Sequence, residues 1–255
     1  GLAKSALLVQ LAKAKFKLAS SSTNGMREFS WLISKQIKNS DPAAHCIQRH
    51  LSVAKFLGCP EIFQYPIAVS DTDKDSAVKK LVAAGININK MLAIHAGGGW
   101  LSRRWPSQNF GLLCQKIKGE FDLDIVLIGG KEGGSGEKGL NEEILSYAGN
   151  AKIFDMSGKF SLKELCAFFN MCKVFVGNEA GPAHIANALN VQSVAILGPT
   201  DAARTGPYKG RTAVIQKSVP CQPCRNRNCP NPICMTQISV DEVFREVAKK
   251  IKAGL

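Results

Sequence analysis

The sequence predicts an α/β fold in which a parallel sheet carries helices on both faces. From Met91 onward, four short apolar segments are typical of strands: MLAIHA, DIVLIGG, KVFVGN and SVAILG. Amphipathic stretches long enough for short helices separate them, and this β–α alternation is typical of parallel sheets. The last amphipathic segment, VDEVFREVAKKIKAG, predicts a closing helix.

The first 65 residues predict a mostly helical region with one short strand near Phe16–Ala19. Amphipathic spacing predicts helices over Arg27–Lys38 and His45–Gly58, the second with Gly58 as its C-cap. Two prolines and the polar run SDTDKDS then indicate a linker. DSAVKKLVAAG predicts one more helix before the regular half begins.

Composition points to a globular chain and leaves its partner open. Apolar residues make up 45% of 255, and no apolar run reaches the roughly 20 residues that cross a bilayer. The chain has no secretory signal and opens within a helical pattern without Met, so we expect a fragment. A net charge of +13 fits either a basic surface or an acidic partner, such as an anionic lipid or a phosphorylated glycan. No RNA- or DNA-binding signature accompanies the lysines of the opening segment, so we expect no nucleic-acid partner.

Nine cysteines in such a chain favour a reducing compartment and free thiols. Five are scattered and are expected to be small buried side chains. The other four follow a C-x2-C-x4-C-x4-C spacing, compact enough for zinc or an iron–sulfur cluster. The alternative is a thiol-rich structural loop. These four candidates are Cys221, Cys224, Cys229 and Cys234.

Glycine and charge gather in the loops that follow the predicted strands. These loops are GGGWLSRRWP, GKEGGSGEKG, EAGP and GPTD. The loops that lead from a helix to the next strand are less rich in glycine and charge by comparison. Ligands of open parallel sheets bind outside the carboxyl ends of the strands, where all four loops would lie. The sequence therefore predicts a ligand crevice at that edge.

The segment GNEAGPAHIANAL predicts a buried helix whose first turn opens onto this crevice. Gly181 suits an N-cap and Pro182 the first helical position, and a helix N-terminus attracts phosphate or carboxylate. His184 either points toward the ligand or is a structural histidine. Glu179 either accepts hydrogen bonds from sugar hydroxyls or caps the helix.

The segment GGGWLSRRWP predicts a second part of the site. Its glycines allow backbone amides to approach a ligand, and Arg103 can bind a diphosphate through two hydrogen bonds. It is neither a dinucleotide fingerprint nor a P-loop, and a structural glycine turn is the alternative. Trp105 is expected to pack in the core rather than to stack on a ligand.

Taken together, these motifs resemble glycosyltransferase family nine, the bacterial heptosyltransferases and their relatives. The resemblance covers essentially the whole chain. It rests on GNEAGPAHIANALNVQSVAILGPTD, on RRWP, and on CQPCRNRNCPNPICMTQISVDEV before the last helix. It implies a GT-B fold: a Rossmann-type C-terminal domain at 91–255, a linker at 71–90, and an incomplete N-terminal acceptor-side domain at 1–70.

The resemblance also implies the reaction and its site. The expected reaction is inverting transfer of a sugar, with heptose from ADP-heptose as the first candidate, to a lipopolysaccharide-core acceptor carrying phosphates. The donor site that it implies comprises Gly97, Gly98, Arg103, Asn178, Glu179, Ala180, Gly181, His184 and Thr200. No cofactor or metal is required, which weakens the case for metal at the four cysteines. The expected location is the cytoplasm, with peripheral association at the inner membrane face as a further hypothesis.

The chain departs from the family pattern in two ways. The family usually has Asp where this chain has Glu179, and Ser or Thr where it has Ala180, so the donor's identity stays open. Family members carry the proposed catalytic Asp on a Gly-rich loop after their first strand, which we expect to lie outside these residues. The alternatives are therefore a nucleotide-sugar binding fragment without catalysis, or a zinc or iron–sulfur module.

Overall fold

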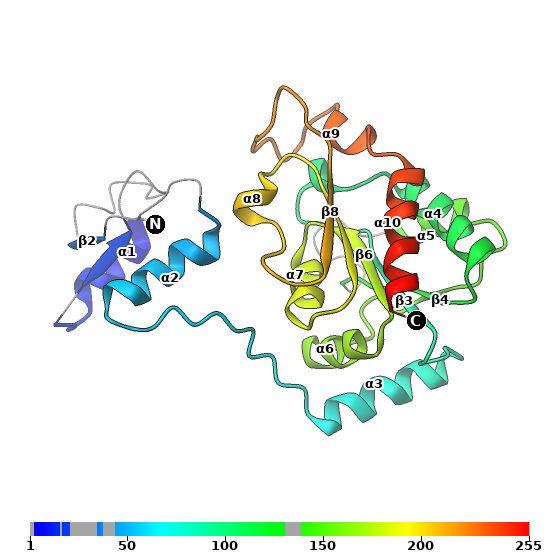
Figure 1. The fold of residues 1–255 in the computed structure, drawn as a ribbon, viewed down its shortest axis with the longest axis horizontal. Helices are drawn as coiled ribbons and strands as arrows, with labels where there is room; N and C mark the ends of the chain where they lie inside the picture. The colour runs from blue at the N-terminus through cyan, green and yellow to red at the C-terminus, as the bar shows by residue number, and fades with distance from the viewer. Residues whose placement is uncertain (1–2, 16, 21–34, 38–43, 131–138, 255) are drawn as a thin grey trace. The chain divides into compact units, whose positions relative to one another are not determined.

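The computed structural model describes residues 3–15, 17–20, 35–37, 44–130 and 139–254 (Figure 1). The chain divides into two compact units. The smaller comprises Gly1–Gln64 with Ala203–Thr205, and the larger comprises Tyr65–Ala202 with Gly206–Leu255. No helix in the described parts is long and apolar enough to cross a membrane.

The smaller unit contains helix α1 (Ala3–Leu11), strands β1 (Leu18–Ser20) and β2 (Lys35–Ile37), and helix α2 (Cys46–Phe56). The two strands pair in parallel, which confirms a strand close to the predicted place. The prediction of a helix over residues 27–38 is wrong at its end, because residues 35–37 form β2. Its remaining residues lie outside the described ones. A short apolar run fits either structure, and backbone pairing with β1 favours the strand here.

Helix α2 confirms the helix expected over residues 45–58. His45 is its N-cap: Nδ1 accepts a hydrogen bond from the amide of Ile47 at 3.2 Å, and Gln48 Oε1 accepts one from the amide of His45 at 3.1 Å. The chain leaves the helix through Gly58, whose φ of 81° is the left-handed conformation that favours glycine after a helix.

The larger unit is built on a six-stranded sheet in which every pair is parallel, in the order β5-β4-β3-β6-β7-β8. The strands are β3 (Met91–His95), β4 (Asp124–Leu127), β5 (Ile153–Asp155), β6 (Val174–Asn178), β7 (Ser193–Leu197) and β8 (Thr212–Gln216). The four predicted strands are confirmed. The sequence did not reveal β5 and β8, because both lie at sheet edges and neither is a fully buried apolar run.

This strand order reverses direction between β3 and β6. From β3 the chain builds outward through β4 to β5, then crosses back to β6 and builds outward through β7 to β8. Such a switch point is where open α/β sheets bind ligands. The two strands approach closely at their carboxyl ends, since a Cβ on Gly177 would lie 2.6 Å from the carbonyl oxygen of His95.

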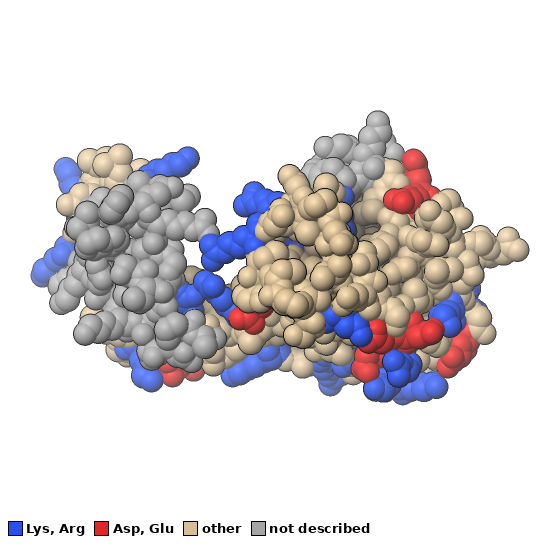
Figure 2. Space-filling model, turned by 90° about the horizontal axis from the view of Figure 1, so that it is seen from above, with Lys and Arg blue, Asp and Glu red and all other residues tan. Residues whose placement is uncertain are grey.

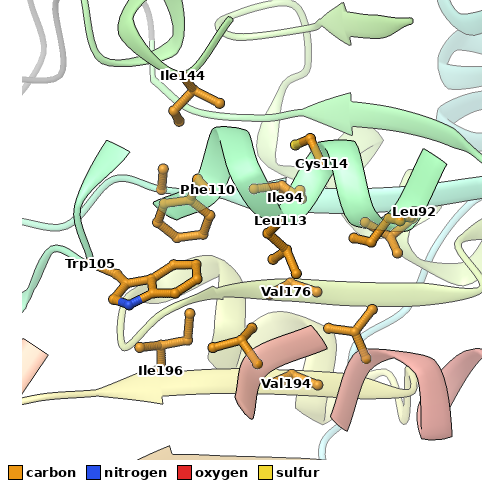
Figure 3. Packing of buried hydrophobic residues seen from close by; sticks show 14 of the residues in the cluster. Leu92, Ile94, Trp105, Phe110, Leu113, Cys114, Ile144, Val176, Val194 and Ile196 are labelled. Atoms are coloured by element: carbon orange, nitrogen blue, oxygen red, sulfur yellow. The ribbon is translucent and has the colours of Figure 1, made fainter. Parts of the chain in front are cut away.

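Helices cover both faces of the sheet (Figure 1). One face carries α4 (Ser107–Glu120), α5 (Leu140–Tyr147) and α10 (Val240–Ala253), and the other carries α3 (Asp71–Ala83), α6 (Leu162–Met171) and α7 (Gly181–Ala188). Alternate residues of β3 serve the two faces: Leu92 and Ile94 pack under α4 (Figure 3), and Met91 and Ala93 pack in the other cluster. Two short helices, η3 (Leu101–Arg103) and α9 (Ile233–Thr236), also belong to this unit. A third, α8 (Ala202–Thr205), falls almost entirely in the smaller unit.

Helix α3, within the segment assigned to the linker at 71–90, confirms the helix expected from DSAVKKLVAAG. Ala77 and Leu81, four residues apart and therefore on one helix face, are completely buried. Lys80 Nζ forms an ion pair with Glu164 of α6 at 2.6 Å. The helix begins at Asp71, four residues before the predicted start, within a run of polar residues. The segment is accordingly part of the larger unit, which begins at Tyr65.

Candidate functional site

The glycine-rich loop after β3 is held in place by its own second arginine. Gly97 and Gly98 are buried, and the chain then passes through Trp100 into the η3 turn. Arg104 donates to the carbonyl oxygen of Gly98 from both Nε (2.9 Å) and Nη2 (2.7 Å). Of the two adjacent arginines, Arg104 therefore shapes the loop, which leaves Arg103 available for other contacts.

Asn178 joins the loop after β3 to the end of β6. Its Nδ2 donates to the carbonyl oxygens of Ala96 (2.7 Å) and Gly97 (3.3 Å), and its Oδ1 accepts from the amide of Trp105 (3.1 Å). The side chain is fully buried. These bonds give Asn178 a positioning role at the switch point, and its contact with the donor stays a prediction.

Trp105 is a core residue, as predicted. Its ring is buried and packs edge-on against Phe110 at 4.9 Å between centroids (Figure 3). Its Nε1 donates to the carbonyl oxygen of Ile238 at 2.9 Å, which satisfies the indole N–H without a ligand. The residue anchors the start of α4 and thereby the loop before it.

Arg103, Glu179 and Thr200 meet at the switch point, from the loops after three different strands. Glu179 is buried, with 5% of its surface exposed, and its Oε2 lies 3.8 Å from Nη1 of Arg103. The hydroxyl of Thr200 donates to the same carboxylate oxygen. Nε of Arg103 is buried and has no hydrogen-bond partner among the described residues. A separation of 3.8 Å is an ion pair rather than a strong hydrogen bond, so the guanidinium keeps most of its donor capacity.

Helix α7 begins one residue earlier than expected and is only half-buried. Ala180 is the N-cap, without a side-chain cap, and Gly181 and Pro182 are the first two helical residues. Ala183 is buried, but Gly181 and His184 are exposed. The expectation of a buried helix was wrong because only one face, with Ala183 and Ala186, is buried, whereas Gly181 and His184 lie on the exposed face. The first turn thus presents an open backbone next to Glu179.

A small pocket of about 50 Å³ lies beside Gly97, at the carboxyl ends of β3, β4 and β5. Asn141 of α5 lies in its wall, where Nδ2 donates to Oδ1 of Asp155 (3.0 Å) and to Oγ of Ser157 (2.6 Å). Gly97 and the loop after β4 were expected at this edge, but Asp155 and Ser157 were not, because β5 was not predicted. The pocket is lined by Gly97, Ile128, Gly129, Gly130, Gly139, Leu140, Asn141, Glu142, Asp155 and Ser157.

The cysteine-bearing segment crosses the same edge between β8 and α10. The amide of Cys224 donates to the carbonyl oxygen of Pro199 at 2.8 Å, which ties the segment to the loop after β7. Cys221 is exposed and Cys234 is buried, and all four thiols are free. Burial raises the pKa of the Cys234 thiol, and the neighbouring Cys221, Cys224 and Cys229 raise it further. Within the described ranges, no three His, Cys, Asp or Glu side chains are arranged to hold a metal ion.

Comparison with known proteins identifies the family. The model of glycosyltransferase family 9 (heptosyltransferase) matches residues 1–234. Over 169 residues the chain is 28% identical to lipooligosaccharide heptosyltransferase 2 of Campylobacter jejuni subsp. jejuni serotype O:6, covering 64% of this chain and 52% of that protein. Over 212 residues it is 26% identical to lipopolysaccharide heptosyltransferase 1 of Campylobacter coli, covering 80% of this chain and 60% of that protein.

Among solved structures, ADP-heptose LPS heptosyltransferase II of E. coli matches with a TM-score of 0.75 at 19% identity, covering 98% of this chain and 74% of that one. This likeness supports the GT-B-like fold. The chain spans about half the length of the curated relatives that it matches. Because the family model covers nearly all of the sequence, the chain belongs to glycosyltransferase family 9, the heptosyltransferases.

Proposed function

We propose that this chain supplies the donor-binding part of a glycosyltransferase that transfers heptose from ADP-heptose to a lipopolysaccharide-core acceptor with inversion. The names of the related proteins support the donor and the acceptor class. The observation that carries the proposal is Arg103, whose guanidinium lies at the switch point with unused donors. A diphosphate is the ligand that such a group binds best.

The proposed chemistry of the chain is stabilisation of the leaving group. As the acceptor hydroxyl attacks the anomeric carbon, negative charge builds on the departing nucleoside diphosphate. Arg103 and the first turn of α7, where Gly181 is exposed, would neutralise this charge. No metal ion is needed in this proposal, because the arginine and the helix terminus supply the positive charge.

The remaining residues are proposed to contact the two ends of the donor. The nucleoside end would lie against the small pocket beside Gly97, with Asn141 and Asp155 in its wall. Ala180 and His184, on the first turn of α7, would lie toward the sugar. Glu179 and Thr200 would fix the direction of Arg103 and contact sugar hydroxyls through the oxygen atoms that face the crevice.

The acceptor proposal rests on charge as well as on the family. The net charge is +13, and Figure 2 shows basic side chains on both units, with acidic ones among them over part of the larger unit. A phosphorylated, lipid-linked glycan would be attracted to such a chain at a membrane surface. We propose a cytoplasmic location with peripheral association at the inner membrane face.

Calorimetric titration with ADP, UDP, GDP and dTDP tests the donor proposal. We expect selective binding of ADP, and a loss of ten- to a hundredfold in affinity for Arg103→Ala, since hydrogen bonds to charged groups contribute about 1.5–3 kcal/mol. Arg211→Ala is the matched control, because it removes the same charge at the amino end of β8, the opposite edge of the sheet. Equal affinities of the two variants would exclude the assignment of Arg103.

Turnover distinguishes a transferase from a protein that only binds the nucleotide sugar. The assay is release of ADP from ADP-heptose on addition of a lipopolysaccharide-core acceptor. Release above the rate without acceptor supports transfer. Tight ADP binding with no acceptor-dependent release would instead support the binding protein.

A further inference from the structure

Trp100 is in contact with two arginines from distant parts of the chain. The guanidinium carbon of Arg103 lies 4.0 Å from the centroid of the Trp100 ring, and that of Arg227 lies 5.0 Å from it. Both distances are within the range of cation–π attraction. A backbone hydrogen bond from the amide of Ser102 to the carbonyl oxygen of Arg227, at 3.3 Å, joins the two segments directly.

The geometry brings the two positive charges within reach of one ligand. Because the two guanidinium carbons lie 4.0 and 5.0 Å from the same centroid, they are at most 9.0 Å apart. A phosphate oxygen that accepts a hydrogen bond from a guanidinium places its phosphorus about 4 Å from the guanidinium carbon. A single phosphate therefore bridges separations up to about 8 Å, and a diphosphate spans the whole range.

The local charge is unbalanced. Glu179 faces Arg103 at 3.8 Å, whereas the ion pairs among the described residues include none that involves Arg227. Arg227 is exposed and so can turn toward a ligand at little cost. Two guanidinium groups beside one carboxylate leave a net positive charge, and a bound anion would relieve their repulsion.

We propose that Arg103 and Arg227, both held against Trp100, form one phosphoryl-binding site, in which Arg227 is a second and direct contact for phosphate oxygens. This inference rests on the proposed function, because Arg103 is assigned there to the donor's diphosphate. The phosphoryl group comes either from the donor or from a phosphorylated acceptor. In both cases the cysteine-bearing segment contributes to binding through an arginine rather than through its thiols.

Calorimetric titration of matched variants tests the site. Arg227→Ala removes the proposed contact, and Arg225→Ala is the control, because Arg225 is an exposed arginine of the same segment. The probes are ADP, AMP, and inorganic phosphate added to the ADP-saturated chain. We expect Arg227→Ala to weaken ADP binding about tenfold and AMP binding less, with Arg225→Ala unchanged. Arg227→Lys should recover part of the affinity, since it keeps the charge but not the planar fork.

The outcomes distinguish a donor phosphate from an acceptor phosphate. They also distinguish a failure of this inference from a failure of the proposed function. A loss confined to inorganic phosphate, with ADP affinity intact, assigns Arg227 to the phosphate of the acceptor. Equal affinity of Arg227→Ala and Arg225→Ala for all three probes overturns the inference, even if Arg103→Ala fails to bind ADP. No ADP binding by the unaltered chain and by Arg225→Ala would refute the proposed function itself. The affinities of Arg227→Ala and Arg225→Ala for inorganic phosphate alone would then still test whether Arg227 contacts a phosphate.

Discussion

Thr200 donates its hydroxyl hydrogen to Oε2 of Glu179, the same carboxylate oxygen that lies 3.8 Å from Nη1 of Arg103. The loops after three strands of the sheet thus contribute one side chain each to a single contact at the switch point. The glutamate, which is one methylene longer than the aspartate that the family resemblance implies here, connects the loop after β7 to the arginine of the loop after β3. The orientation of Arg103 therefore depends on Glu179 and Thr200.

Thr200→Val should destabilise the protein by about 1–2 kcal/mol, because it takes a hydrogen bond from a carboxylate that is 5% exposed. Thr200→Ser keeps the hydroxyl and should stay within about 0.5 kcal/mol of the parent. Urea denaturation of the three proteins measures the difference. Equal destabilisation by Ser and Val would mean that the methyl group of Thr200, rather than its hydroxyl, supports the site.

Asn178→Ala should destabilise the protein by about 2–4 kcal/mol and weaken ADP binding. The change leaves the carbonyl oxygens of Ala96 and Gly97 and the amide of Trp105 without their side-chain partner at a buried site. Thermal unfolding and calorimetry check the two effects, with Asn150→Ala as the exposed control. Lower ADP affinity at unchanged stability would indicate a direct contact with the donor and contradict the positioning role.

Glu164 should make stability depend on pH between about 5 and about 2. Hydrogen bonds from Lys80, then Ser76, then the Ser161 backbone lower the pKa of its carboxyl from 4.5 to about 2. A lowered pKa means stability that is present above the unfolded value and lost as pH falls toward the folded one. Glu164→Gln should therefore cost about 2 kcal/mol at pH 7 and progressively less as the pH falls through this window.

Denaturation at several pH values measures the Glu164 effect. Glu246→Gln is its control, because Glu246 pairs with Lys249 on an exposed face of α10. We expect the control to differ little from the parent at every pH, as exposed pairs contribute about 0–1 kcal/mol. A difference between Glu164→Gln and the parent that stays constant from pH 7 to pH 3 would contradict the lowered pKa.

The central sheet could be predicted because its strands are buried on both faces. Met91–His95 and Ser193–Leu197 are buried throughout and apolar at four of five positions, and such runs are distinctive in a sequence. The edge strand Ile153–Asp155 is short and partly exposed, so it gave no such signal. Helix α3 was predicted from Asp75 onward, but its start at Asp71 was not, because its first residues belong to a polar run that indicated a linker.

The candidate site was predictable as a set of loops but not as a set of contacts. Because all strands are parallel, every loop after a strand lies at one edge, and this placed Arg103, Glu179 and Thr200 in the same region. The direction of a side chain depends on packing that spacing does not encode. The two adjacent arginines thus have different partners, and Arg227 reaches Trp100 across 127 positions of the chain only through the fold.

A crystal structure of the chain with ADP bound tests the central claim most directly, since it shows where the diphosphate lies. The predicted result has phosphate oxygens within hydrogen-bond distance of Arg103 and next to the first turn of α7, with the adenosine against the small pocket beside Gly97 and Asn141. A nucleotide bound away from the carboxyl ends of β3 and β6, with Arg103 still facing only Glu179, would contradict the assignment of the donor site.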